Sequence, residues 1–421
     1  MQFKLVKINE ERALQVFRTL DSAWKNRDSV FKNIKLPQDR IKPTETDPRL
    51  LGLWFLFTVQ TQRGGVGSEV PMRLLLSLFE DPAAREMFIP ERIITDWPAE
   101  RIEKTLRDGV IARLLQAAET TDAQPGLFGE SEVCPTQAKG NGHIQRNKQL
   151  TRVQLLAKLE EEVKGYRFDE LSQSWYSNAH SLVNHWGGDV RNVFWGVTEF
   201  EEAFRRVDYY RAPKAGFYGM RRKIFSLLVI WLQERGLAPF FPAPVPVDFH
   251  ALRVLTATGC VEFSKALPIP NKPKYPGWMH GKVAVRINEG IMDEIACWSQ
   301  TFLVKHDLSH LAVNPALWVL SRELCMLNPG NKTSSKGATY VLPEQLAQDA
   351  RLWPRNYHDV CSKCPVGASC TKVSPSGTYY KWGLLMTQLP RVPFPLLGAT
   401  QVLPEMAEQH SLSLSGWRQR R

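Results

Sequence analysis

The chain has 421 residues, of which 43% are hydrophobic, and its formal net charge at pH 7 is +11. This apolar content is normal for packed globular proteins and excludes disorder of the whole chain, while the length allows two or three domains. The positive charge favours a polyanionic partner, with nucleic acid as the leading class.

The N-terminal segment MQFKLVKINEERALQVF contains no apolar core of signal-peptide length, and no later run reaches about 18 apolar residues. We therefore expect a soluble cytoplasmic protein, associated with the nucleoid if the source is bacterial. The seven cysteines are an odd number, and three of them lie between Cys361 and Cys370. Such clustering does not suit a secreted disulfide framework and favours metal ligation in a reducing compartment.

Helical periodicity runs from Glu10 to about residue 118, as in RLLGLWFLFTVQTQ and ERIEKTLRDGVIARLLQAAE. Residues 119–149 are polar and lack periodicity, which indicates a mobile insertion that interrupts one domain. The helical pattern resumes from Leu150 to Gly236 and from Val247 to about Leu327, and few stretches alternate like a half-buried strand. The sequence therefore predicts a mainly α-helical protein.

A cysteine cluster near the C-terminus predicts a metal centre. Cys361, Cys364 and Cys370 have the spacing C-x2-C-x5-C, and soft thiolates select zinc, copper(I) or iron–sulfur clusters. Cys325, at the end of the predicted helix ALWVLSRELC, is the nearest candidate for a fourth ligand. Four thiolates suit zinc or a [4Fe–4S] cluster. The single CxxC pair favours the cluster, because structural zinc sites commonly have two such pairs. Three further cysteines are interpreted as spare or buried thiols: Cys134, Cys260 and Cys297.

The cysteine pattern, preceded by the helix LWVLSREL, resembles the iron–sulfur loop of endonuclease III-type enzymes in the helix-hairpin-helix DNA glycosylase superfamily. In that family the first two cysteines are close in sequence, whereas 35 residues separate Cys325 from Cys361 here. The chain would thus be a divergent member with an enlarged loop. The resemblance implies that the four cysteines hold a structural [4Fe–4S] cluster that faces DNA.

The segment KAGFYGMRRKIFSLLVIWL has a glycine-containing turn followed by a basic helix start, and such a terminus can hold a phosphate. It resembles the hairpin of the family, which implies DNA contacts for Gly219, Arg221 and Arg222. Lys223 falls where lyase-active members carry a nucleophilic lysine. Met220 and Arg221 replace a second family glycine, and a side chain there would crowd the phosphate. The alternative is a basic start to a buried structural helix.

Downstream, PVDFHALRVLTATG resembles the family segment that carries the catalytic aspartate, which places Asp248 in that role and Arg253 on the following helix. An aspartate at a helix start is ordinarily an N-cap, and both roles are compatible. The stretch GLAPFFPAPV makes the spacing from Lys223 to Asp248 longer than is usual in the family.

Upstream, DPRLLGLWFLFTVQTQ resembles an early family helix, with Gln60 as the wedge that fills the gap left by a flipped base. SWYSNAHSLVNHWGGDV resembles a family segment that ends in a Gly-Gly turn. The resemblance spans roughly residues 45–118 and 150–372 and implies a two-lobed glycosylase-like fold with a C-terminal iron–sulfur loop. The chain is accordingly divided as follows: 1–118, N-terminal helical part; 119–149, insertion; 150–300, hairpin and catalytic region; 301–372, cluster region; 373–421, C-terminal extension.

The implied function is excision of a damaged or modified base from duplex DNA after base flipping. Asp248 would stabilise positive charge on the sugar. Lys223 would form a Schiff base if it enters the pocket, giving AP lyase activity, and water would attack if it faces phosphate. Two alternatives remain: a noncatalytic iron–sulfur DNA-binding protein of a modification or defence system, and a glycosidase acting on RNA or free nucleosides.

Three weaker patterns remain. Gln124, Leu127 and Phe128 resemble the peptide by which bacterial repair proteins dock on the replication sliding clamp, although an apolar pair that packs locally explains them too. His306 and His310 lie four apart on a predicted helix, a spacing that can bind metal, but the absence of a carboxylate signature favours a solvent-facing or core pair. The terminal WRQRR is interpreted as a basic tail.

Overall fold

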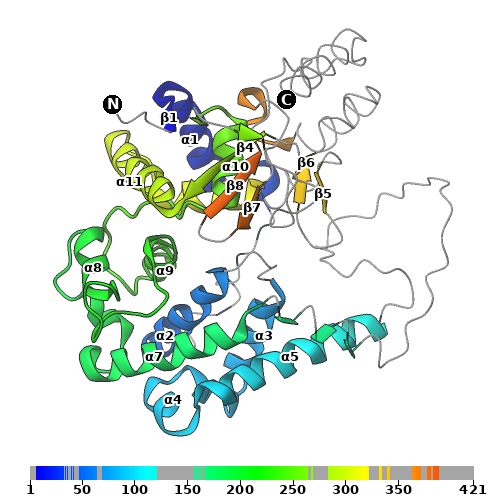
Figure 1. Cartoon of the computed structure of the whole chain (residues 1–421). Helices are drawn as coiled ribbons and strands as arrows, with labels where there is room; N and C mark the ends of the chain where they lie inside the picture. Colours follow the sequence, from blue (N-terminus) through cyan, green and yellow to red (C-terminus); the bar gives the residue numbers. More distant parts are fainter. Residues whose placement is uncertain are drawn as a thin grey trace, which may run out of the picture. The chain divides into compact units, whose positions relative to one another are not determined.

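The structure is a computed structural model of the whole chain. Within the described residues the chain is mainly α-helical, which confirms the predicted class (Figure 1). No helix in this part combines the length and apolar character needed to cross a membrane. The described residues are 6–32, 34, 36, 39, 41, 47–63, 69–120, 156–157, 159–160, 163–164, 166–263, 267–268, 283–321, 331–333, 339–341, 363–370, 377–380 and 383–387.

The described residues form two compact units. Unit 1 draws on the ranges Met1–Arg40, Gly196–Phe204 and Met220–Arg421, and unit 2 on Ile41–Trp195 and Arg205–Gly219. The division therefore does not follow chain order, since the first 40 residues join the C-terminal part. One boundary cuts the helix α8 (Phe200–Val207), and another falls directly after Gly219.

The helix α2 (Pro48–Val59) is a buried element of unit 2. Asp47 caps its start by accepting a hydrogen bond from the Arg49 N–H (2.9 Å), and proline suits the first turn because that turn needs no N–H donor. Every residue from Leu51 to Val59 is buried, as expected for a helix that is apolar all round.

The helix α7 (Phe168–Trp186) packs against α4 and α5 and also contacts α2 (Figure 1). Its Trp175 indole N–H donates to the Phe57 carbonyl (2.8 Å), and the two rings are in contact. Gly187 and Gly188 end α7 with φ of +58° and +70°, which confirms the predicted Gly-Gly turn. The other helices of unit 2 are η4 (Gln60–Arg63), α3 (Glu69–Glu80), η5 (Ala84–Phe88), α4 (Pro90–Asp96), α5 (Ala99–Thr120) and η6 (Val190–Phe194).

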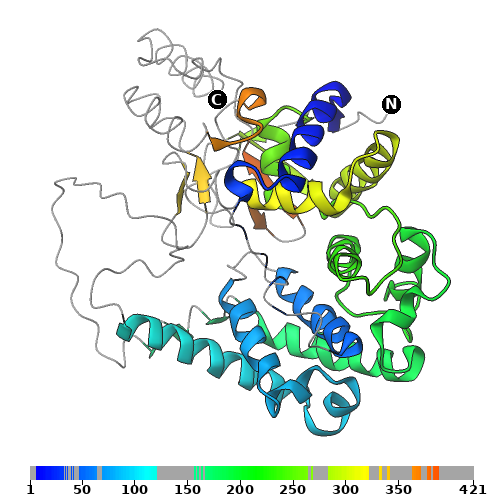
Figure 2. The same ribbon diagram turned by 180° about the vertical axis from the view of Figure 1, so that it is seen from behind.

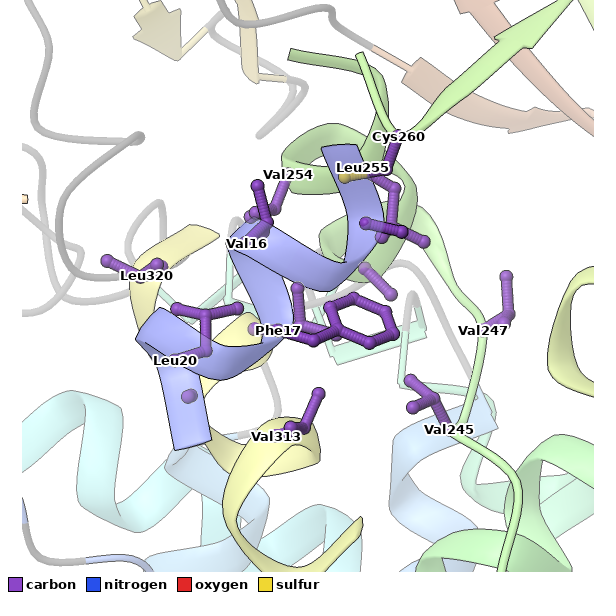
Figure 3. Close-up of a cluster of buried hydrophobic side chains, with 14 of the residues drawn as sticks. Val16, Phe17, Leu20, Val245, Val247, Val254, Leu255, Cys260, Val313 and Leu320 are labelled. Carbon is purple, nitrogen blue, oxygen red and sulfur yellow. The ribbon is translucent and has the colours of Figure 1, made fainter. Parts of the chain in front are cut away.

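Unit 1 has its core where α1 (Glu10–Lys25) packs on α12 (His310–Val319), which in turn packs on α10 (Phe249–Ala257) (Figure 2). Phe17 points from α1 toward Val245 and Val247, just before α10 (Figure 3). Two further α-helices belong to the described part of this unit: α9 (Arg222–Glu234) and α11 (Glu289–Lys305). It also contains two short 3-10 helices, η1 (Ser29–Phe31) after α1 and η11 (Gly367–Ser369).

Short antiparallel strands accompany the helices of unit 1. The strand β1 (Val6–Ile8) pairs with β2 (Val261–Phe263), so the beginning of the described chain is tied to the end of α10. A four-stranded sheet has the order β3-β4-β8-β7 and uses residues of the predicted C-terminal extension. The remaining strands are β3 (Leu267–Pro268), β4 (Val283–Asn288), β5 (Asn331–Thr333), β6 (Thr339–Val341), β7 (Gly377–Tyr380) and β8 (Gly383–Thr387).

Two sequence predictions are wrong. The helical pattern from Val247 onward is interrupted by β2, β3 and β4, because β4 finds its partner β8 far along the chain, beyond the reach of a local pattern. His306 and His310 do not share a helix, since α11 ends at Lys305 and Asp307 is left-handed (φ +53°). His310 is instead a core residue, with Nε2 2.7 Å from Gln233 Oε1, and burial lowers its pKa to about 4.

Candidate active site and nucleic-acid interface

The segment predicted to form a hairpin turn lies directly before α9. Gly219 has φ of +75°, in the left-handed region that favours glycine, and α9 begins three residues later. Arg221 occupies the N-cap position and makes no side-chain capping bond there. Met220, which replaces a family glycine, is 3% exposed and therefore points into the fold. Its side chain does not crowd the solvent side of the turn.

Lys223 and Asp248, the two predicted catalytic residues, face each other. The Lys223 Nζ lies 3.8 Å from the Asp248 Oδ2, and the two side chains are 25% and 19% exposed. Asp248 also caps α10, because its Oδ1 accepts from the backbone N–H groups of His250 (2.8 Å) and Ala251 (3.1 Å). One carboxylate oxygen is thus fixed by the helix while the other is directed at the lysine amine.

The proline-rich segment 235–247 returns the chain from the end of α9 to the level of its start. The helix from Lys223 to Glu234 is about 17 Å long at 1.5 Å per residue, and the thirteen residues of the segment reach much further when extended. Gln233 Nε2 holds the segment through the carbonyls of Pro239 and Phe241 (both 2.9 Å). Ser299 Oγ accepts from the Val245 N–H (3.0 Å). Segment 235–247 is therefore long enough to bring Asp248 back to Lys223, despite the long spacing between them in the sequence.

Arg222 is held by Glu201 from α8 in a two-pronged ion pair, with Nη2 3.0 Å from Oε2. Its guanidinium carbon also lies 5.1 Å from the Phe204 ring centroid, and the side chain is only 15% exposed. The hydrogen bond to Glu201 raises the pKa of Arg222. A DNA phosphate would have to compete with Glu201 for this guanidinium.

Arg221 is more accessible than Arg222. Its guanidinium pairs with Glu289, and both side chains are about half exposed, so the pair is worth little in stability. The nearby Asp293 has its pKa raised by burial, against the opposing effect of Arg222. Of the two predicted arginine contacts, Arg221 is therefore the more exposed to an incoming phosphate, at 48% against 15% for Arg222.

Two residues of α10, the helix that Asp248 caps, are hydrogen-bonded to Ser321, which follows α12. His250 Nδ1 lies 3.0 Å from Ser321 Oγ, and Arg253 Nη1 donates to the Ser321 carbonyl (3.4 Å). Arg253 is completely buried, with its guanidinium 4.1 Å from the Phe249 ring centroid. These contacts fix the position of the helix that carries Asp248, so Arg253 supports the site from within the core.

Gln60 follows the last residue of α2 and is 2% exposed. In the described part of the chain neither the oxygen nor the nitrogen of its side-chain amide has a hydrogen-bond partner. Leaving such a group buried and unpaired costs about 1 to 3 kcal/mol. As a wedge in DNA, this side chain would have to leave its buried position.

Replacement of Gln60 by Met is expected to raise the free energy of unfolding by about 1 kcal/mol, because the similar shape is kept and the unpaired amide is removed. Gln60→Glu should lower it, since it buries a carboxylate without a partner. Urea unfolding of the two variants and the wild type measures both changes. A destabilised methionine variant would mean that the amide is paired inside the folded protein.

The predicted metal ligands are described only in part. Cys325 and Cys361 lie outside the described residues, whereas Cys364 and Cys370 are half-buried on a turn in unit 1. The turn is closed by a hydrogen bond from Gly367 N–H to the Cys364 carbonyl (2.9 Å), and Val366 is buried in the core of the unit. Two of the four predicted ligands therefore lie on one short turn of unit 1.

Other predicted features also fall outside the described residues. They include the clamp-docking segment with Gln124, Leu127 and Phe128, most of the insertion 119–149, and the terminal WRQRR. In the described part of the chain no group of three or more His, Cys, Asp or Glu residues is arranged to hold a metal ion.

Sequence reasoning missed Glu201, Gln233 and Ser321. Glu201 lies in the acidic first turn of α8, where a solvated helix start is the ordinary interpretation. Its contact with Arg222 depends on packing between segments 21 residues apart. Gln233 carried a weak signal, since a polar residue in the apolar run of α9 must find a buried partner.

Comparison of the chain with protein-family models, with curated proteins and with solved structures finds no match.

Proposed function

We propose that the protein is a DNA glycosylase that flips a damaged or modified base out of duplex DNA and cleaves its N-glycosidic bond, with AP lyase activity through Lys223. The observation that carries the proposal is the pairing of Lys223 Nζ with Asp248 Oδ2 at 3.8 Å. One family resemblance suggests both residues, which are 25 positions apart in the sequence, and the fold brings their side chains together.

The chemistry needs a carboxylate and an amine with different tasks. Asp248 places its carboxylate close to the sugar, where positive charge develops as the glycosidic bond breaks. After Lys223 has lost its ammonium proton to water, its amine forms a bond to the sugar C1′, while the glycosidic electron pair leaves with the base. The proton lost by the amine passes through water to the departing base. The amine nitrogen then expels O4′, which takes up a proton from water, and this opening of the sugar ring gives the Schiff base that allows strand cleavage.

The turn at Gly219 and the start of α9 supply the binding part of the proposal. Backbone N–H groups at a helix N-terminus attract phosphate, and Arg221 adds accessible charge beside them. The turn directly precedes Lys223 in the chain. A phosphate held there would therefore place the adjoining sugar near the amine.

The four cysteines Cys325, Cys361, Cys364 and Cys370 would hold a [4Fe–4S] cluster, with zinc as the alternative. When bound, such a cluster would fix the loop 363–370 and its Lys363 for contact with DNA phosphate. The chain residues alone account for base excision, so no step of the proposed reaction requires a change in oxidation state.

The test is borohydride trapping on a panel of duplexes that each contain one modified base. We expect a covalent protein–DNA adduct with at least one duplex for the wild type, and no adduct for Lys223→Ala. Lys25→Ala is the matched control, because Lys25 also pairs with a carboxylate of unit 1, Asp21, at 2.6 Å. It should form the adduct as the wild type does.

Other outcomes select between the alternatives. Excision without any adduct in the wild type indicates a monofunctional glycosylase, in which Lys223 contacts phosphate. Duplex binding with no excision on any substrate supports the noncatalytic DNA-binding protein. Release of bases only from RNA or free nucleosides supports the third class and rejects the proposal.

A further inference from the structure

Unit 2 carries three exposed aromatic side chains, two of which, Tyr210 and Tyr218, both contact the ring of Tyr209. Single exposed hydrophobic residues are normal on a protein surface, but groups of them indicate binding. Three of the five exposed large hydrophobic side chains in the described part of the chain are Trp195 (82%), Tyr210 (76%) and Tyr218 (43%). The two tyrosines lie in the connection between α8 and α9, residues 208–219, which we call the tyrosine loop.

The tyrosine loop is rigid because its backbone is hydrogen-bonded within itself. The N–H groups of Ala212 and Gly216 donate to the carbonyls of Asp208 (2.8 Å) and Ala212 (2.6 Å), respectively. Gly216 also packs so closely that an added Cβ would lie 2.6 Å from the Tyr209 Cα. The ring of Tyr209 meets that of Tyr218 edge to face at 5.2 Å. The tyrosines are therefore presented in a fixed arrangement.

Three side chains of α7 donate hydrogen bonds to the backbone of the tyrosine loop. The Ser181 hydroxyl donates to the Gly216 carbonyl (3.0 Å), and the Trp186 indole N–H donates to the Ala215 carbonyl (3.0 Å). The Asn178 amide donates to the Tyr218 carbonyl (3.3 Å). These hydrogen bonds hold the backbone, while Tyr210 is 76% exposed and Tyr218 is 43% exposed. The exposure of the rings is thus not a consequence of a loose loop.

The backbone of Trp195 is hydrogen-bonded to the residues that directly precede the tyrosine loop. Arg206, near the end of α8, donates from Nη1 to the carbonyls of Val193 (3.0 Å) and Trp195 (2.7 Å). The tryptophan ring itself is the most exposed of the large hydrophobic side chains. Arg206, two residues before the loop begins, therefore fixes the backbone of Trp195.

The surface is basic as well as aromatic. Arg205, Arg211 and Lys214 are exposed, and the loop with its entry carries Asp208 as the only acidic residue between positions 205 and 219. Asp208 Oδ2 pairs with Arg211 (3.4 Å), but the arginine side chain remains 69% exposed. The positive charges lie among the exposed rings along this stretch of chain.

We propose that Trp195, Tyr210 and Tyr218 form a binding surface for an unpaired nucleic-acid strand. Flat rings in a fixed position can stack on bases, and interspersed cations can contact the phosphates between them. In a duplex the base faces are covered by neighbouring base pairs, so this surface selects single strands. The inference goes beyond the proposed function, because Trp195, Tyr210 and Tyr218 are not among the residues assigned to base excision or to its phosphate contact.

The test is fluorescence anisotropy of the full-length protein with labelled oligo-dT, oligo-rU and a duplex of equal length at one fixed salt concentration. Wild type should bind at least one single strand more tightly than the duplex. Trp195→Ala and Tyr210→Ala should each weaken single-strand binding about tenfold, since stacking on one ring contributes about that factor or more. Tyr210→Phe should retain binding, because it keeps the ring.

Phe240→Ala is the matched control, since Phe240 is 72% exposed but belongs to unit 1. It should bind oligo-dT as the wild type does. The inference is overturned if the double variant of Trp195 and Tyr210 binds single strands like the wild type, or if the wild type binds none. Binding of an acidic peptide instead of any oligonucleotide also overturns it. Asp248→Asn separates the two proposals, because it should lose excision and keep oligo-dT binding.

Discussion

Substitution of Asp248 by Asn, Ser or Ala should lower base excision at least about a hundredfold in all three variants, because each removes the carboxylate. Stability should respond differently. Asn and Ser keep an oxygen that can accept from His250 N–H and Ala251 N–H, whereas Ala leaves the start of α10 without its cap. Only the alanine variant should lose about 1 kcal/mol of unfolding free energy.

Single-turnover excision rates and urea unfolding of the three variants measure the two effects separately. The ion pair with Lys223 does not disturb this comparison, because all three variants lose it and a partly exposed pair contributes little. Near-normal excision by the serine variant would show that Asp248 serves only as a helix cap. The proposed chemistry would then have no carboxylate at this position.

Replacement of Cys364 by Ser should remove most of the bound iron and the brown colour of the purified protein. A [4Fe–4S] cluster needs four thiolates, and the loss of one ligand weakens its hold on the other three. The thermal midpoint should also fall, since Cys364 packs against the core of unit 1 and Val366 on the same turn is buried in it. Iron and zinc analysis with the visible spectrum measures the change.

Cys297→Ser is the matched control for the cysteine experiment. Cys297 lies on α11, is exposed, and has its pKa raised by partial burial, as expected for an unreactive thiol. This variant should keep its metal content and colour. Stoichiometric zinc in a colourless wild-type protein would favour the zinc alternative, and the absence of both metals would contradict a metal centre.

Local features of the site were predictable from the sequence. The turn at Gly219 follows from a glycine directly before a basic helix start, and its φ of +75° agrees. Asp248 before an apolar helical run predicts an N-cap, and the two hydrogen bonds from the α10 amides confirm it. Each depends on residues within a few positions, so the local pattern carries the information.

The partners of the arginines and the burial of Gln60 were not predictable. Glu201 captures Arg222 only because α8 and α9 pack together, and Gln60 is enclosed although its neighbours Thr61 and Gln62 are polar. A basic motif shows that positive charge is present but not whether the protein itself neutralises it. Long-range packing decides that, and it changes which arginine is available to phosphate.

The sequence by itself determined the mainly helical class and the positions of the caps and turns, which follow from periodicity and from contacts within one helical turn. The two residues proposed for catalysis were suggested by the family resemblance. Only the tertiary structure decided that Lys223 and Asp248 meet, because the segment 235–247 between them is held by Gln233 and Ser299 from two different helices. Such pairing depends on how the backbone returns on itself, a property of the packed chain that residue spacing alone does not specify.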